Sequence, residues 1–152
     1  MKLKVLWVGK SRERWIKEAI EEYAGRIRRY LPLELIDIRD EKGAEAEDMR
    51  RRECERLEKQ ISSSATVIIL DERGDQLDSV GLATFVGKER DNGINELIFV
   101  IGGAYGFSQE FRQRGKLLAL SKMTFTHQMI RAFLLEQIYR SFTILNKEPY
   151  HH

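Results

Sequence analysis

The sequence predicts an α/β fold in which a mostly parallel sheet is flanked by helices, within one domain that spans residues 1–152. Short apolar segments typical of strands alternate along the chain with longer segments of helical periodicity. The segment TVIIL (66–70) is apolar throughout, as are strands that are buried on both faces of a parallel sheet. No repeat, low-complexity segment or linker divides the chain, so a single core is expected.

In the first part of the chain, KLKVLWV (2–8) has the composition of a strand, and a helix is expected from Arg14 until Pro32 ends it. LELIDI (33–38) alternates in period two, which predicts a second strand. A heavily charged helix with a thin apolar stripe is expected over residues 44–62. The apolar positions that predict the first helix are Trp15, Ile16, Ala19, Ile20, Tyr23, Ile27 and Tyr30.

In the second part, the strand TVIIL runs into a turn at residues 71–74, and a helix is expected over 79–88. ELIFVI (96–101) predicts the next strand and leads into a glycine-rich turn. A short helix near 108–113 precedes the strand LLALS (117–121), and a last long helix is expected over 126–145. This last helix is apolar nearly all round, which is typical of a deeply buried helix or of one shared with a second chain.

Composition excludes several classes of protein. No apolar run approaches the roughly 20 residues that span a bilayer, and the N-terminal segment reads as a strand, so no membrane association is expected. The single cysteine, Cys54, permits no internal disulfide, which favours a reducing, cytoplasmic location. One cysteine and three histidines, two of them at the end of the chain, do not make a tetrahedral zinc site, so no metal is expected.

Charge is distributed unevenly although the net charge is only +2. Residues 1–109 hold 19 Lys and Arg against 21 Asp and Glu, whereas residues 110–152 hold 7 against 3 and contain all three histidines. One interpretation is that this uneven distribution arises by chance and that the charged residues lie on a solvent-exposed face. The other is that the C-terminal part contacts an anion such as RNA phosphate.

Ligands of parallel sheets lie outside the carboxyl ends of the strands, which directs attention to three strand ends. These are Leu70-Asp71, Gly102-Gly103 and Leu120-Ser121-Lys122. The turn after residue 101, GGAYG, matches neither a Walker A loop nor a dinucleotide-binding fingerprint, so taken alone it is either a tight turn or a place of close backbone approach. No nucleophile elbow or catalytic cysteine pattern occurs, which favours chemistry that uses a bound small molecule and backbone groups instead of a nucleophilic side chain.

The C-terminal third contains the most specific sequence pattern, LSKMTFTHQMIR (120–131) followed by EQIYR (136–140) and PYHH (149–152). With VLWVGK (5–10), ELIDIRDEK (34–42), TVIILDERG (66–74) and FVIGGAYG (99–106), this ordered set covers essentially the whole chain. On these segments the chain resembles the RlmH family of the SPOUT superfamily of S-adenosylmethionine-dependent methyltransferases. Members of that family methylate N3 of a pseudouridine in 23S ribosomal RNA.

The resemblance implies a fold and a cofactor site. It implies that the C-terminal part of the chain forms a deep trefoil knot, which sequence patterns alone would not predict because knots are rare. It also implies that S-adenosylmethionine lies bent among the knot loops, against glycine backbone and between apolar side chains. Without the resemblance, Leu70 and Phe125 would be assigned to core packing. The residues implied to bind the cofactor are Leu70, Gly102, Gly103, Gly106, Leu120, Ser121, Lys122, Met123, Thr124 and Phe125.

Methyl transfer to N3 requires removal of a proton and alignment of the two reactants. The catalytic candidates are His127, Arg131, Tyr150 and His151, because a neutral imidazole accepts a proton near pH 7 and a phenol stacks on or hydrogen-bonds to a flipped base. The candidates for substrate binding are Lys122, Arg131, Arg140, Tyr150 and His151. The tail at 149–152 is alternatively a disordered end without function.

Arg140 lies nine residues after Arg131, about half a turn out of phase, so both cannot serve one site from one helix face. Glu136, four residues before Arg140, favours a surface ion pair instead. A homodimer, as in the family, would allow Arg140 and the tail to reach the neighbour's site. Thr126 stands where the family has proline, which either loosens the loop or caps the helix.

The function expected from the resemblance is methylation of 23S ribosomal RNA on assembled ribosomes, since a small chain without an added RNA-binding domain needs a preformed surface. Three alternatives remain at this point. The chain methylates another RNA such as tRNA, or it is a non-catalytic ribosome-binding factor, or it is a generic nucleotide-binding module.

Overall fold

The computed structural model describes all 152 residues and has the predicted α/β architecture. Five strands form one fully parallel sheet in the order β2-β1-β4-β3-β5. The strands are β1 (Lys2–Val8), β2 (Leu33–Ile38), β3 (Thr66–Gln76), β4 (Glu96–Ile101) and β5 (Lys116–Ala119). The helices are α1 (Arg14–Ile27), α2 (Ala46–Glu58), α3 (Ser79–Asp91), α4 (Gln109–Arg112) and α5 (Met129–Leu145).

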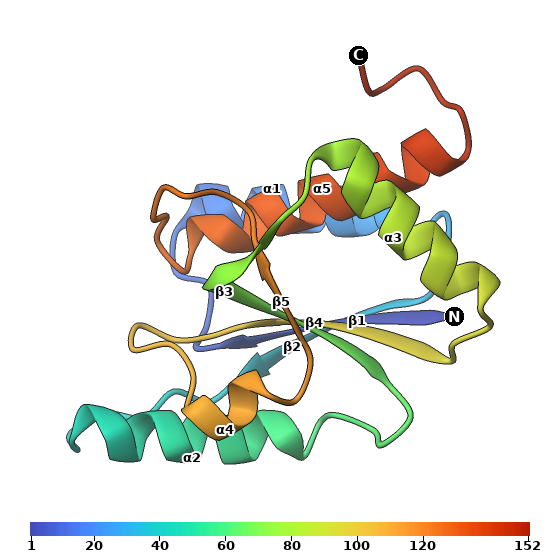
Figure 1. Cartoon of the computed structure of the whole chain (residues 1–152). Coiled ribbons are helices and arrows are strands. Elements are labelled where there is room, and N and C mark those ends of the chain that lie inside the picture. The colour runs from blue at the N-terminus through green and yellow to red at the C-terminus, as the bar shows by residue number, and fades with distance from the viewer.

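Helices cover both faces of the sheet, as Figure 1 shows. Helices α1, α3 and α5 pack on one face and share a core cluster with alternate residues of β1 and β4, such as Val5 and Phe99. Helices α2 and α4 cover the other face, where Leu6 and Val100 join a second cluster. Strands β1 and β4 are therefore buried on both sides, which explains their nearly continuous apolar sequence. No helix combines the length and the hydropathy that a membrane span requires.

Strand β3 differs from the sequence expectation because it continues to Gln76 instead of ending at Leu70. Both Leu70 and Asp75 pair with Leu118 of β5, so the intervening residues form an irregularity in the ladder. Gly74 makes this possible, because a Cβ there would lie 2.5 Å from the Leu117 carbonyl carbon. The expected turn at 71–74 is thus a bulge within a longer strand.

Several element ends also differ from the prediction. Helix α5 begins at Met129, not at Thr126, α2 is shorter at both ends than 44–62, and β5 ends at Ala119. At the start of α5, the Thr126 hydroxyl accepts a hydrogen bond from the Met129 backbone N–H at 3.2 Å. This contact supports the interpretation that Thr126 caps the helix.

Helix α1 confirms the predicted helical spacing, with one exception that bears on the site. Its buried residues are Ile16, Ile20, Ala24 and Ile27. Trp15 belongs to the apolar series in the sequence, yet its side chain is 55% exposed. The indole therefore lies outside the core that the periodicity predicts.

Candidate functional site

A cavity of about 980 Å³, hereafter the cleft, opens at the carboxyl ends of β3, β4 and β5. This is the edge of the sheet at which the three strand ends were expected to meet. The predicted residues that line the cleft are Leu70, Gly102, Gly103, Gly106, Leu120, Ser121, Met123, Thr124, Phe125 and His127. Lys122 is exposed and lies outside the lining. The structure thus brings together nearly all of the residues implied to bind the cofactor.

The glycine-rich turn after β4 forms one wall of the cleft. It closes through a hydrogen bond from the Gly106 N–H to the Gly103 carbonyl at 3.1 Å, and Gly106 has a φ of +71° that side chains other than glycine rarely adopt. A Cβ on Gly102 would meet the Phe107 ring at 3.0 Å, and one on Gly103 would meet Val8 and the Glu53 carboxylate. Packing behind the turn therefore already favours both glycines, and close approach of a cofactor stays a prediction.

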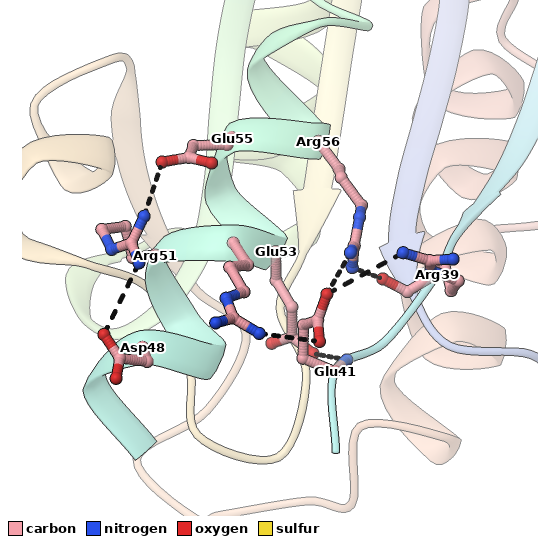
Figure 2. A network of polar contacts seen from close by, with 8 residues as sticks. Arg39, Glu41, Asp48, Arg51, Glu53, Glu55 and Arg56 are labelled. Atoms are coloured by element: carbon pink, nitrogen blue, oxygen red, sulfur yellow. Dashed lines mark hydrogen bonds and ion pairs between the residues drawn. The ribbon is translucent and has the colours of Figure 1, made fainter. Parts of the chain in front are cut away.

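A network of charged side chains connects α2 with the segment that follows β2, as Figure 2 shows. Glu53 is only 5% exposed and accepts a hydrogen bond from the Glu41 backbone N–H at 3.0 Å. Burial raises the pKa of the Glu53 carboxyl above 4.5. The Glu41 carboxylate pairs with Arg56, and this hydrogen bond lowers its pKa. Glu53 therefore fastens the segment after β2 to α2, and its carboxylate lies 3.2 Å from where a Cβ on Gly103 would stand.

A second polar contact closes the cleft beside β3. Asp71, whose side chain is 5% exposed, accepts a 2.7 Å bond from Arg112 of α4 and a 2.9 Å bond from the Arg73 backbone N–H. Both Asp71 and Arg112 line the cleft. The ion pair therefore fixes the bulge of β3 relative to α4.

The segment 121–128 forms the opposite wall and is largely exposed. Ser121 Oγ accepts a hydrogen bond from the Met123 N–H at 3.0 Å, and the Phe125 ring packs edge-on against Phe133 at 5.2 Å. Met123 is 76% exposed. This wall therefore offers the exposed Met123 side chain to the cleft, beside the packed ring of Phe125.

His127 is the titratable candidate that lies in the cleft. Burial, followed by the nearby cations Arg131 and Arg12, lowers the pKa of its imidazole below 6.5. The ring is therefore neutral at pH 7 and able to accept a proton.

Arg131 lies behind the cleft and has no exposed surface. Its guanidinium donates to the Val8 carbonyl at 2.8 Å, to Ser11 Oγ at 3.0 Å and to the His127 carbonyl at 3.2 Å, and it stacks over Trp7 at 5.2 Å. Burial lowers its pKa to about 10, so it remains a cation at neutral pH. Direct contact with a phosphate does not fit this placement. The geometry instead supports a role in positioning His127.

The other three candidates gather at the far end of α5. Arg140 pairs with Glu136 at 2.5 Å, which confirms the expected ion pair, and its guanidinium lies 4.7 Å from the Tyr150 ring centre and 3.3 Å from His151 Nδ1. Tyr150 donates to Glu136 at 3.0 Å. The 17 residues of α5 span about 25 Å. Within one chain the tail lies at the C-terminal end of α5 (Figure 1), whereas the cleft is lined by residues at the helix's start, such as Met129 and Ile130.

Sequence reasoning missed Trp15, Glu53, Arg112 and Gln128. Trp15 and Gln128 line the cleft, and Gln128 bonds to the backbone of residues 10 and 12. The hydrogen-bond partners of Glu53, Arg112 and Gln128 are backbone atoms or residues that are distant in the sequence, so no local sequence pattern predicts their positions. A tryptophan at the first turn of a helix, directly after a cationic loop, was the one available signal.

Comparison with known proteins gives a match over nearly the whole chain. A family model described as "Predicted SPOUT methyltransferase" matches residues 1–151. Proteins called "Ribosomal RNA large subunit methyltransferase H" are similar over full length: that of Pelobacter propionicus is 71% identical and covers 100% of both chains. That of Geobacter metallireducens is 63% identical over 100% of this chain and 99% of its own. Among solved structures, the SpoU methyltransferase AviRb of Streptomyces viridochromogenes, in complex with AdoMet, has a TM-score of 0.46 at 14% identity, covering 93% of this chain and 58% of that one.

Proposed function

Because the chain belongs to the SPOUT methyltransferase family, we propose that it transfers a methyl group from S-adenosylmethionine to the ribosomal RNA of the large subunit. The observation that carries this proposal is the 71% identity, over the full length of both chains, to a protein named for that activity. The cleft at the carboxyl ends of three parallel strands is the proposed binding site for the cofactor. Membership of the family also implies that the chain forms the trefoil knot around this cleft.

The cleft fits S-adenosylmethionine in size and chemistry. Its volume lies at the upper end of the roughly 300–1,000 Å³ typical of small-molecule pockets, and it joins apolar walls to a backbone turn. Bound there, the cofactor supplies an electrophilic methyl group. The apolar side chains Leu70, Leu120, Met123 and Phe125 would flank an adenine. The backbone of residues 102–106 and of 121–124 would offer N–H and C=O groups to its polar edges.

We propose N3 of a pseudouridine as the methyl acceptor, and His127 as the group that takes its proton. His127 lines the cleft and is neutral at pH 7, as a general base must be. Arg131 holds the His127 carbonyl and thereby the start of α5. Its part is positioning, because the guanidinium is fully buried.

We further propose that the chain acts as a homodimer. Arg140, Tyr150 and His151 form one cluster at the end of α5 that is remote from the cleft of the same chain. A second chain can bring this cluster to the cleft, where Tyr150 and His151 would contact the base. The exposed Lys122 would contact RNA phosphate beside it.

The assembled ribosome is the proposed partner, which places the protein in the cytoplasm. The test is transfer of labelled methyl groups from S-adenosylmethionine to three substrates in parallel: ribosomes, naked ribosomal RNA and tRNA. Label in ribosomes is expected to exceed label in the other two at least tenfold. Equal labelling of naked RNA would refute the ribosome as substrate, and preferential labelling of tRNA would refute the target. Cofactor binding without label in any RNA would indicate a factor that has lost the reaction.

A further inference from the structure

The loop between β1 and α1, together with the first helical turn, borders the cleft through Glu13 and Trp15. This segment, residues 9–15, is fastened to the start of α5. Gln128 accepts a hydrogen bond from the Arg12 N–H and donates one to the Lys10 carbonyl, both at 3.1 Å. Arg131 donates to Ser11 Oγ at 3.0 Å. Segment 9–15 is therefore held rigidly beside His127.

Trp15 of this segment lines the cleft and is 55% exposed. It is not alone: Trp15, Tyr105, Met123 and Phe125 are four of the seven large apolar side chains that the chain exposes, and all four line the cleft. Scattered exposed apolar residues need no explanation, but a concentration around one cleft indicates an interaction site. The Trp15 ring has no aromatic partner within the chain, unlike Phe125, which packs against Phe133.

The charges of segment 9–15 indicate the kind of partner. Lys10 and Arg12 are exposed, and neither forms an ion pair with a carboxylate, whereas Arg14 is paired with Glu18 at 2.9 Å. Glu13 is the one acidic residue of the segment. Unpaired cations next to an exposed indole are the combination by which proteins hold single-stranded RNA, because cations contact phosphates and aromatic rings stack on bases.

We propose that segment 9–15 is an RNA-contact element, in which Trp15 stacks on an unpaired base and Lys10 and Arg12 contact the neighbouring phosphates. This proposal rests on the proposed function and adds specific residues to its substrate site. A second copy of this chain, whose tail is proposed to reach the cleft, is the less favoured occupant of segment 9–15 itself, because the exposed Lys10 belongs to a residue type that is depleted in protein–protein interfaces.

The test compares Trp15→Ala, Trp15→Phe and the double variant Lys10→Ala/Arg12→Ala with the wild type on ribosomes. Val80→Ala and Lys59→Ala are matched controls, since Val80 is 49% exposed and Lys59 is exposed, and neither lines the cleft. Trp15→Ala is expected to raise KM for ribosomes about 5- to 150-fold, the range that base–aromatic stacking covers, and to raise KM for S-adenosylmethionine much less. Trp15→Phe should retain most of the affinity. The double variant should lower the slope of log KM against log salt by about 1.4, the share of two phosphate contacts.

An unchanged KM for ribosomes in Trp15→Ala, while the wild type turns over, would overturn the proposal and leave the proposed function standing. A shift of Trp15→Ala to a different oligomeric state would assign the face to a second copy and also overturn it. If the wild type shows no methyl transfer, indole fluorescence decides separately. Trp7 is 3% exposed, so quenching of an exposed indole by a single-stranded RNA oligonucleotide, excited at a wavelength that RNA does not absorb, reports Trp15, and its absence would refute the contact.

Discussion

Replacement of Gly74 by alanine tests how the cleft is built. Gly74 lies where the second part of β3 runs against β5, in the irregular stretch between the pairs Leu70–Leu118 and Asp75–Leu118. A Cβ at this position would lie 2.5 Å from the Leu117 carbonyl carbon, 2.7 Å from its oxygen and closer still to the Leu118 nitrogen. These are backbone atoms of a strand, so no side-chain rotation relieves the overlap.

The expected loss of stability follows from this geometry. Overpacking in a closely packed interior costs about 1–3 kcal/mol. The two strands must also separate at Asp75–Leu118 and Gln76–Ala119, and each backbone hydrogen bond lost there costs about 0.5–1.5 kcal/mol. We therefore expect Gly74→Ala to lower the free energy of unfolding by about 2–6 kcal/mol, a large part of the 5–15 kcal/mol of a typical domain.

The assay is urea unfolding, with Gly25→Ala as the matched control. Gly25 lies within α1 and nothing lies within 4 Å of an added Cβ, so alanine there should raise the free energy of unfolding by about 0.5–1 kcal/mol. Calorimetry should also show weaker binding of S-adenosylmethionine by Gly74→Ala, because β3 and β5 supply two walls of the cleft. A Gly74→Ala protein within 1 kcal/mol of the wild type would refute this account of the β3–β5 contact.

Three further predictions concern titratable groups. The rate of methyl transfer should fall as the pH drops through the lowered pKa of His127, below 6.5, because only the neutral imidazole accepts a proton. The variant His127→Gln should lose at least about 100-fold in kcat and should also lose this fall in rate at acidic pH. An unchanged pH dependence in the variant would exclude His127 as the base. Arg112→Ala leaves the buried Asp71 carboxylate without its cation and should lower the free energy of unfolding in urea by about 2–3 kcal/mol. The double variant Arg112→Ala/Asp71→Asn should recover part of this lost stability. A loss under 0.5 kcal/mol in Arg112→Ala would contradict the proposed role of the pair. Because the pKa of Glu53 is raised in the folded state, the wild type loses stability as the pH rises through that pKa. The Tm of Glu53→Gln relative to the wild type should therefore increase between pH 4 and pH 7. A constant difference in Tm between the two proteins would show that burial of this charge costs nothing.

The elements of the fold were predictable from the sequence because each has a local signal. The apolar run 66–70 and the alternation at 33–38 mark strands, and the spacing in 14–27 marks a helix. The strand order and the extension of β3 were not predictable. They depend on contacts between distant segments, such as the close approach of Gly74 to the Leu117–Leu118 backbone.

The cleft was predictable from the rule that ligands lie beyond the carboxyl ends of parallel strands, and the family resemblance assigned residues to it. The buried placement of Arg131 was not predictable, because its acceptors are the Val8 carbonyl, the Ser11 hydroxyl and the His127 carbonyl. Backbone acceptors leave no trace in a sequence, so an arginine among apolar residues resembled a phosphate contact. Trp15 was missed for a different reason. Its spacing in the sequence fits the buried face of α1, but at this position the face is not covered and the side chain is exposed.

The position of the transferred methyl group tests the central claim most directly. Ribosomes that lack the modification would be incubated with the protein and S-adenosylmethionine, and the large-subunit RNA digested with nucleases for mass spectrometry. The account predicts a single added methyl group, on N3 of one pseudouridine of the large-subunit RNA. A methyl group on another base or another RNA, or none under conditions in which an active relative methylates the same ribosomes, would contradict it.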